Sequence, residues 1–374
     1  MSDVDGELMP AGPAPSADRR LRVAMVTSVA EHCGIAAYSR RLVSELERHV
    51  EIAWLTDAEH FSPVMNEADI VHVQHQYFLF GGVAPWKSTF RRFAKRVTAP
   101  MVMTVHEFVA PAGSPARRLA IASANRMNFG HVGIREFIVH TDQDHNRLAS
   151  AGVARNRVHV IRHGVPDPPP MPARVQARKE LGLEQSFVLT IYGFLARRKG
   201  YGLAIEALSM LPPNVRLILA GGRHPDDRTT YADEIERTVT RAGLADRVTI
   251  TGYLSDEQSA TVMAATDLVL APFEESSGSG SLAYAFSCGK PVVASAIAPN
   301  VEINRVVPGA LSLFPAGNAA ALADAVAHLM RNARALTRLS EGARRYATTF
   351  TYGTMAEATV AVYHEAIRNA DSCA

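Results

Sequence analysis

Cysteine is scarce in this chain, which has three cysteines among 374 residues. Cys33, Cys288 and Cys373 lie far apart in the sequence and form no CxxC pair. That spacing argues against a disulfide framework and against a cysteine-based zinc site, and it is typical of a protein from a reducing compartment. We therefore expect a cytoplasmic protein.

Long apolar runs are also missing, and none approaches the roughly 18 uninterrupted residues that a membrane-spanning helix needs. The net charge is +2, which neither demands nor excludes nucleic acid, and no segment looks like a nucleic-acid-binding module. Residues 1–20 are acidic and then basic, with three prolines and no apolar segment. They are expected to form a disordered tail and not a signal peptide.

Short β-rich runs alternate with helical patterns through most of the chain. Several runs, such as VLTIY and VRLILAG, are continuously apolar, as strands of a parallel sheet buried on both faces should be. Two sets of this alternation predict an α/β protein with two doubly wound, Rossmann-like domains. The predicted strands are Leu21–Thr27, Glu51–Leu55, Asp69–His75, Met101–His106, Phe137–His140, Val158–His163, Phe187–Tyr192, Val215–Ala220, Val248–Thr251, Leu268–Ala271, Pro291–Ala294 and Leu311–Phe314.

A proline-rich segment marks the boundary between the two sets. Gly164–Arg174 holds five prolines in eleven residues, which predicts a stiff connector. We place an N-terminal domain at 21–165, a linker at 166–180, a second domain at 181–352 and a final helix at 353–374 that packs on either domain. Because ligands of open parallel sheets bind beyond the carboxyl ends of the strands, two such domains are expected to face a central cleft.

The segment Pro272–Ser295 is the most informative in the chain. It has the pattern of a strand, a Gly/Ser loop, a short helix stopped by Gly289 and Pro291, and a further strand. A helix N-terminus with free backbone N–H groups and a partial positive charge favours a phosphate or a diphosphate. The alternative, a flexible linker, fits poorly because regular hydrophobic segments flank the loop on both sides.

Two loops of the first half also follow predicted strands and are rich in polar groups or glycine. Gly34 precedes a helix and permits close approach of a ligand to the backbone, although a tight turn is an equally good interpretation. The other lies within VHVQHQYFLFGG, where dense polar groups at the end of a predicted strand are expected to recognise hydroxyl groups. A hydrogen-bonded core network is its alternative interpretation. The residues on this acceptor side are Gln74, His75, Gln76 and Tyr77.

Two further strand ends carry ionisable groups. His106 directly follows an apolar strand, where its side chain is expected to project into the cleft, although a lone histidine is often only structural. Arg197, Arg198 and Lys199 precede Gly200 and a helix. These cations are expected to neutralise phosphates held by the Gly/Ser loop, and a solvated basic turn is the alternative.

The stretch Trp86–Val97 is a basic amphipathic pattern, with aromatic residues at helical spacing and Lys or Arg between them. Such a helix lies on an anionic membrane surface or, more often, buries its aromatic face in the core. Weak contact with the inner face of a membrane is therefore an open alternative to a purely cytoplasmic location.

In their order along the chain, these segments resemble the retaining family 4 glycosyltransferases of the GT-B fold (glycosyl transferases group 1). The resemblance runs from about Leu21 to the last helix. It rests on GIAAYS, TVHE, VIRHGVP, YGFLARRKG, AGGRHP, TGYLSDEQ, ATDLVLAPF and CGKPVVAS. VQHQYFLFGG and SGSLAYA are further similar to a subgroup with QHEYGIFGG and SGTLAYA signatures.

The resemblance implies specific roles around a nucleotide-sugar donor. His106 matches the histidine beside the donor sugar, and Tyr253 and Leu254 match residues near the nucleobase. The implied catalytic residues are His106 and Lys199. The implied diphosphate site consists of Gly34, Arg197, Arg198, Lys199 and the amides of Ser279, Gly280 and Ser281.

The chain departs from the family pattern at three positions. Phe194 stands where the family usually has arginine after a glycine, so Arg197 or Arg198 is expected to supply that charge. The family's E-x7-E glutamates, which hold the donor sugar and the ribose, fall on Ser276 and Tyr284. Glu275 and Glu302 are the carboxylates that the resemblance leaves as substitutes.

The implied activity is transfer of a hexose from a UDP-, GDP- or ADP-linked sugar to a hydroxyl, with retention of the anomeric configuration. The acceptor would be a glycan, a glycolipid or a small-molecule glycoside. No carboxylate cluster indicates a metal, and no cofactor is expected besides the nucleotide sugar. The alternatives are a nucleotide-sugar epimerase or hydrolase on the same scaffold, and a donor-binding protein that has lost catalysis.

Overall fold

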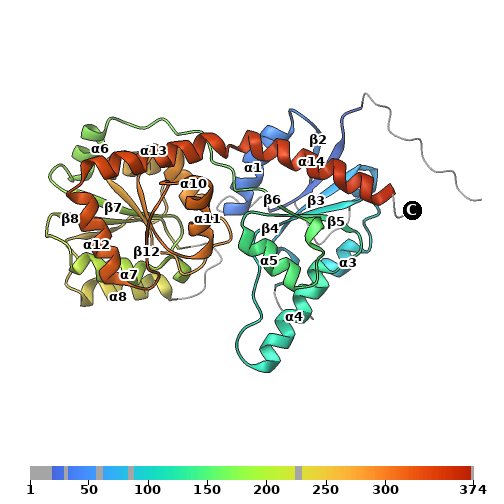
Figure 1. Cartoon of the computed structure of the whole chain (residues 1–374), viewed down its shortest axis with the longest axis horizontal. Helices are drawn as coiled ribbons and strands as arrows, with labels where there is room; N and C mark the ends of the chain where they lie inside the picture. Colours follow the sequence, from blue (N-terminus) through green and yellow to red (C-terminus); the bar gives the residue numbers. More distant parts are fainter. Residues whose placement is uncertain (1–18, 29–32, 56–61, 83–87, 224–229, 372–374) are drawn as a thin grey trace, which may run out of the picture.

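The computed structural model describes residues 19–28, 33–55, 62–82, 88–223 and 230–371. Its strands form two separate parallel six-stranded sheets, seen side by side in Figure 1. In the first sheet the strand order is β2-β1-β3-β4-β5-β6. The strands are β1 (Arg22–Val26), β2 (Glu51–Leu55), β3 (Ile70–His75), β4 (Met101–Val105), β5 (Ile134–Val139) and β6 (Val158–Val160).

The second sheet has the order β12-β11-β10-β7-β8-β9. In each sheet the strand order reverses once, between β1 and β3 in the first and between β7 and β10 in the second. Such switch points are where open α/β sheets bind ligands. The strands are β7 (Phe187–Tyr192), β8 (Val215–Ala220), β9 (Val248–Ile250), β10 (Leu268–Ala271), β11 (Val292–Ser295) and β12 (Ser312–Phe314).

Helices connect the strands and cover the sheets (Figure 1). We call β1–β6, α1–α5 and α14 the N-terminal half, and β7–β12 with α6–α13 the C-terminal half. The helices of the N-terminal half are α1 (Gly34–Leu46), α2 (Val64–Glu67), α3 (Phe90–Ala94), α4 (Pro115–Phe129), α5 (Asp142–Ser150) and α14 (Tyr352–Asp371). Those of the C-terminal half are α6 (Arg174–Leu181), α7 (Tyr201–Ser209), α8 (Tyr231–Arg241), α9 (Asp256–Ala265), α10 (Gly280–Ser287), α11 (Ala298–Val306), α12 (Ala319–Met330) and α13 (Ala333–Thr349).

The prediction of a doubly wound α/β fold with two parallel sheets is confirmed. All twelve predicted strands are present, and β2, β7, β8 and β10 have the predicted bounds. β3 and β4 are buried along their whole length. Helices cover both faces of a parallel sheet, which is why its strands appear in the sequence as continuous apolar runs. The largest differences are at β5, which begins at Ile134, and β6, which ends at Val160.

The last helix crosses back from the C-terminal half to the N-terminal half, where it lies over α1 in Figure 1. Its buried residues, which include Tyr352 and Tyr363, share a hydrophobic cluster with Tyr38 and Leu42 of α1. Burial of a large side chain of this kind contributes roughly 1.5–3 kcal/mol, which is enough to hold the helix against the first sheet. The two segments that cross between the halves are also joined, since Val165 N–H donates to Phe350 O at 2.7 Å.

Two predicted segments lie partly or mainly outside the described residues. Residues 1–18 of the predicted tail are not described, while Arg19 pairs with Asp69 at 2.6 Å. Trp86 is likewise outside the described part of the Trp86–Val97 stretch. Phe90, Phe93 and Val97 are buried in the N-terminal core, so this aromatic face packs inside the protein and does not face a membrane.

Within the part of the chain that the structure describes, no helix is long and apolar enough to span a membrane.

Candidate active site

The Gly/Ser loop after β10 ends in the N-terminus of α10, as its sequence predicts. Ser279 is the N-cap, and its hydroxyl accepts a hydrogen bond from Leu282 N–H at 3.2 Å. The first N–H groups of a helix have no partner within the helix, so Gly280 and Ser281 present donors at a positive helix end. The loop lies beside the switch point between β10 and β7 and can therefore bind an anion there.

Lys199 lies at the end of the turn after β7 and is 6% exposed. Its ammonium group donates to Tyr192 O at 2.9 Å and to Ser281 Oγ at 2.8 Å. The structure thus brings the predicted lysine to the predicted phosphate loop. Burial, and secondarily the charge of Arg198, lowers the pKa of Lys199 to about 7. An anion bound beside this group would favour its charged form.

Gly193 explains how β7 and α10 approach so closely around this lysine. Its φ is +103°, and a Cβ atom at this position would lie 2.2 Å from Lys199 Nζ and 2.6 Å from Ser281 Oγ. A side chain there would displace the Lys199 ammonium group or the Ser281 hydroxyl, and the backbone conformation also favours glycine. The glycine of the YGFLARRKG motif is therefore required by the geometry of the lysine.

The two arginines of this turn have different surroundings. Arg197 points to α8, where it pairs with Glu234 at 2.5 Å and lies 4.7 Å above the Tyr231 ring. Arg198 acts electrostatically on Lys199. The expectation that Arg197 faces the diphosphate is not met in this structure, because the acidic first turn of α8 holds its guanidinium group.

His106 lies at the end of β4, opposite the Gly/Ser loop. Ser277 Oγ donates to His106 O at 2.5 Å, which joins that loop to the N-terminal half. The His106 ring lies edge-on to Tyr38 with 4.7 Å between centroids. Burial, followed by neighbouring histidines of which His140 is the strongest, holds the pKa of His106 well below its usual range. His106 is therefore neutral at physiological pH.

A chain of buried side chains links His106 to α14. His106 Nε2 donates to Gln74 Oε1 at 2.8 Å, and the Gln74 amide nitrogen lies 3.3 Å from His72 Nε2. The other nitrogen of His72 lies 2.7 Å from the Tyr363 hydroxyl. Gln74 is thus a positioning group for His106 and is not free to bind an acceptor hydroxyl.

The other acceptor-side predictions are largely core residues. His75 is fully buried among aromatic rings, including Phe80 stacked at 5.7 Å, and its ring nitrogens have no hydrogen-bond partner among the described residues. Tyr77 is 2% exposed and donates to Asn125 Oδ1 at 2.5 Å. Gln76 alone of the four is partly exposed. The strand-end polar residues are buried because both faces of β3 are covered, so every side chain of the strand lies in the interior.

The carboxylates predicted to hold the sugar or the ribose contact protein groups instead. Glu275 pairs with Arg147 of α5 at 3.2 Å. Glu302 accepts hydrogen bonds from the backbone N–H groups of Asp142 at 2.8 Å and Gln143 at 3.0 Å. Both partners come from the N-terminal half, so the prediction that these two glutamates bind the donor is not supported by this arrangement.

The remaining predicted residues lie around the same cleft. Ser276 is 6% exposed, and the Tyr284 ring stacks on Tyr192 at 4.6 Å. Tyr253 is 58% exposed with its ring 6.5 Å from Phe194, whereas Leu254 packs into a small hydrophobic cluster. Gly34 is the first residue of α1, and a Cβ there would meet nothing within 4 Å. Tyr253 and Phe194 thus form an aromatic surface next to the turn that carries Lys199.

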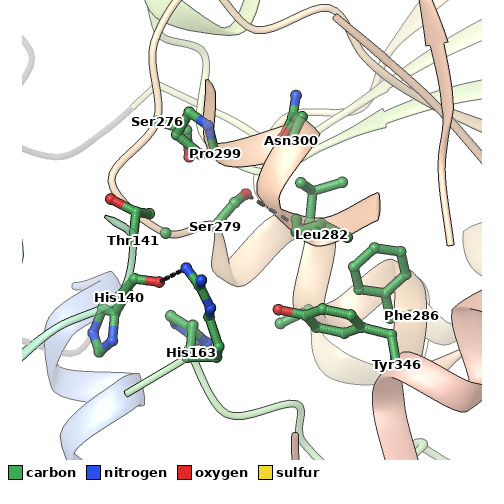
Figure 2. Close-up of a pocket in the computed structure, with 14 residues that line it drawn as sticks. His140, Thr141, His163, Ser276, Ser279, Leu282, Phe286, Pro299, Asn300 and Tyr346 are labelled. Atoms are coloured by element: carbon green, nitrogen blue, oxygen red, sulfur yellow. Dashed lines mark hydrogen bonds between the residues drawn. The ribbon is translucent and has the colours of Figure 1, made fainter. Parts of the chain in front are cut away.

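The sequence analysis missed a cluster of rings between the two halves. His140 and His163 lie 5.5 Å apart, and each lies against the Tyr38 ring. Figure 2 shows both beside a small cavity that Ser276, Ser279 and Asn300 line from the C-terminal half. His140 directly follows β5, as His106 follows β4, and His163 lies three residues beyond the end of β6, so the rule that pointed to His106 also points to this end of the sheet.

Among the described residues, one group has the spacing of metal ligands: Glu136, His159 and Glu365. Glu136 already accepts hydrogen bonds from His159 at 2.8 Å and from Asn369 at 2.7 Å. The group joins α14 to β5 and β6 and is not part of the cleft. Hydrogen bonds between these elements explain why the three side chains lie close together.

Comparison with solved structures identifies the fold class. Anabaena HepE, solved in complex with UDP and glucose, superposes with a TM-score of 0.72 at 20% identity and covers 92% of this chain and 100% of its own. The two doubly wound sheets facing one cleft are the GT-B fold of glycosyltransferases.

The sequence comparisons agree with this fold class. Residues 174–346, from α6 to α13, match the family model of glycosyl transferases group 1. D-inositol 3-phosphate glycosyltransferase of Xylanimonas cellulosilytica is 27% identical over 79% of this chain and 72% of its own length. The enzyme of that name from Mycobacterium tuberculosis (strain ATCC 25177 / H37Ra) is 28% identical over 81% of this chain and 63% of its own length.

Proposed function

We propose that this protein is a retaining, metal-independent glycosyltransferase that moves a hexose from a nucleoside diphosphate sugar to an acceptor hydroxyl. The observation that carries the proposal is the contact of Lys199 with Ser281 at the N-terminus of α10. A buried cation and free helix amides at one switch point are suited to a diphosphate. UDP and glucose in HepE, together with the D-inositol 3-phosphate glycosyltransferase relatives, support this class of donor.

The chemistry follows from charge that is already in position. When the sugar–phosphate bond breaks, negative charge develops on the departing diphosphate, next to Lys199 and the amides of α10. Preorganised donors of this kind usually contribute the largest catalytic effect. Neutral His106 faces the sugar from the N-terminal half, and the departing phosphate accepts the proton of the acceptor hydroxyl. Closure of the cleft excludes water and limits hydrolysis of the donor.

The decisive experiment has two stages. Thermal shift against UDP, GDP, ADP and TDP and their common hexosides identifies the donor, because ligands that bind the native state raise the melting temperature. Proton NMR of the reaction with a panel of polyol, sugar and sugar-phosphate acceptors, in the presence of EDTA, then gives the product configuration. We expect the anomeric configuration of the donor in the product, formed without metal. An inverted product, or complete loss of turnover with EDTA, contradicts the proposal.

One observation favours a second candidate, a donor-binding protein without catalysis. The two carboxylates available for the sugar, Glu275 and Glu302, are engaged with α5. Firm donor binding with no turnover across the acceptor panel is the outcome that identifies it. An epimerase or hydrolase would instead consume the donor equally fast with and without acceptor.

A further inference from the structure

Glu302 binds the start of a helix in the opposite half of the molecule. It lies on α11, its side chain is 12% exposed, and its two carboxylate oxygens accept from the first two N–H groups of α5. The next amide, Asp144 N–H, donates to the Thr141 hydroxyl at 2.9 Å. The first backbone N–H groups of α5, which have no partner within the helix, thus donate to two acceptors: the Thr141 hydroxyl next to the helix and the Glu302 carboxylate from the other half.

Arg162 completes the contact. It lies after β6, its side chain is 13% exposed, and it donates to Glu302 Oε2 at 2.7 Å, Asp142 Oδ1 at 2.9 Å and His140 O at 3.1 Å. A carboxylate at a helix N-terminus that also pairs with a buried arginine has both favourable charge and saturated hydrogen bonds. Two exposed ion pairs, Arg305–Asp142 and Arg147–Glu275, lie at the rim of this contact.

The contact lies next to the place where the phosphate loop meets the N-terminal half. α5 follows β5 through His140, and a Cβ atom at Gly278 of the loop would lie 3.1 Å from His140 Cβ. On the other side of the loop, Ser277 donates to His106 O. Any separation of α11 from α5 therefore also moves Ser277–Ser281 away from His106.

We propose that Glu302 is a positioning residue that closes the cleft: it docks the C-terminal half on the N-terminus of α5 and sets the distance between the diphosphate loop and His106. The docking itself is a property of the ligand-free chain. Its consequence for turnover rests on the proposed function. Glu302 then acts through the geometry of the cleft and makes no contact with the donor ribose or sugar.

Hydrogen exchange tests the docking without any ligand. The first amides of a helix ordinarily exchange fast because they lack partners, so protection at Asp142 and Gln143 reports the carboxylate from the other half. In peptides that cover residues 140–146, we expect slow exchange in the wild type and at least tenfold faster exchange in Glu302→Ala. Glu302→Gln, which keeps one acceptor oxygen, should lie between them. Glu206→Ala, at an exposed position of α7, is the matched control and should equal the wild type.

Fast exchange of these amides in the wild type overturns the proposal, whether or not any variant folds. Unchanged protection in folded Glu302→Ala overturns it as well. These outcomes do not depend on donor identity, so they are separate from a failure of the proposed transferase activity.

Kinetics separate a positioning role from donor binding. Lys199 and α10 both belong to the C-terminal half, so Glu302→Ala should leave the Kd of the nucleoside diphosphate within about twofold of the wild type. The kcat of sugar transfer should fall about tenfold, because the His106 side of the cleft is displaced. A rise in the diphosphate Kd as large as the fall in kcat would indicate a ribose contact and would overturn the positioning role.

Discussion

The two halves of the molecule are both built on a six-stranded parallel sheet, but they differ in strand order and build their sides of the cleft from different chemistry. The C-terminal half uses backbone amides, a buried lysine and glycine at a position where a Cβ atom would displace the lysine, as at Gly193. The N-terminal half uses neutral rings, among them His106, His140 and His163, held by burial and by one another. Charge is thus concentrated on the side that would bind the diphosphate.

The family model of glycosyl transferases group 1 matches residues 174–346, which belong to the C-terminal half. An anion site built from backbone amides requires glycine at fixed positions, so we expect this half to tolerate little change in sequence there. The ring cluster requires only buried side chains of suitable shape, which many sequences can supply. The N-terminal half is therefore where we expect acceptor specificity to vary.

The largest expected effect concerns acidic pH and the N-terminal half. Burial lowers the pKa of His72, His75 and His163 to about 3 and that of His140 to about 4, and it lowers the pKa of His106 as well. The unfolded chain binds these protons near pH 6.5, so stability is fully present above that pH and is lost as the pH falls. Between the pKa of the unfolded chain and that of the folded protein, each such histidine lowers the free energy of unfolding by about 1.4 kcal/mol for each pH unit.

Urea unfolding between pH 7.5 and 5 measures this loss, which should reach several kcal/mol. Simultaneous replacement of His140 and His163 by Asn should make the pH dependence shallower. Equal stability at both pH values would contradict the neutral, buried state of the cluster.

The next effect concerns Lys199 in the C-terminal half. Lys199→Met keeps the packing but removes the charge, and we expect turnover to fall roughly 10²–10³-fold, as for other preorganised donors. Arg197→Met, on the same turn but directed to α8, should change turnover less than about threefold. Because the pKa of Lys199 is about 7, the affinity of the wild type for a diphosphate should weaken above that pH.

Steady-state kinetics and a pH series of diphosphate Kd values check this expectation. If the diphosphate Kd of Lys199→Met depends on pH as that of the wild type does, Lys199 is not the group that titrates. If Lys199→Met and Arg197→Met lose equal turnover, Lys199 is not the cation that stabilises the departing diphosphate.

The smallest effect concerns the connection between α14 and His106. Tyr363→Phe leaves a nitrogen of buried His72 without a partner, which should destabilise the protein by about 1–2 kcal/mol. Tyr346→Phe is the matched control, because the Tyr346 side chain is also largely buried but lines the small cavity and makes no hydrogen bond among the described residues. Denaturant titration compares the two variants. Equal stability of both would mean that the Tyr363–His72 contact does not stabilise the N-terminal half.

The fold could be predicted because buried parallel strands appear in the sequence as apolar runs. The Gly/Ser loop and the helix that follows it could be predicted because serine favours a helix N-cap and glycine favours a turn. Side-chain partners could not be predicted in the same way. Glu302 and Asp142 are separated by 160 residues, and no local pattern indicates that one holds the amides of the other. Gln74, His75 and Tyr77 are polar residues at a strand end, but their direction depends on rings from α3 and α4 and on α14.

Titration calorimetry of UDP, GDP and ADP into the wild type, Lys199→Met and Arg197→Met at pH 6.5 tests the central claim most directly. The claim is that Lys199 and the N-terminus of α10 form a nucleoside diphosphate site. We predict that at least one nucleotide binds the wild type and Arg197→Met alike and binds Lys199→Met at least tenfold more weakly. Binding of none of the three, or equal affinity in all three proteins, would contradict the claim.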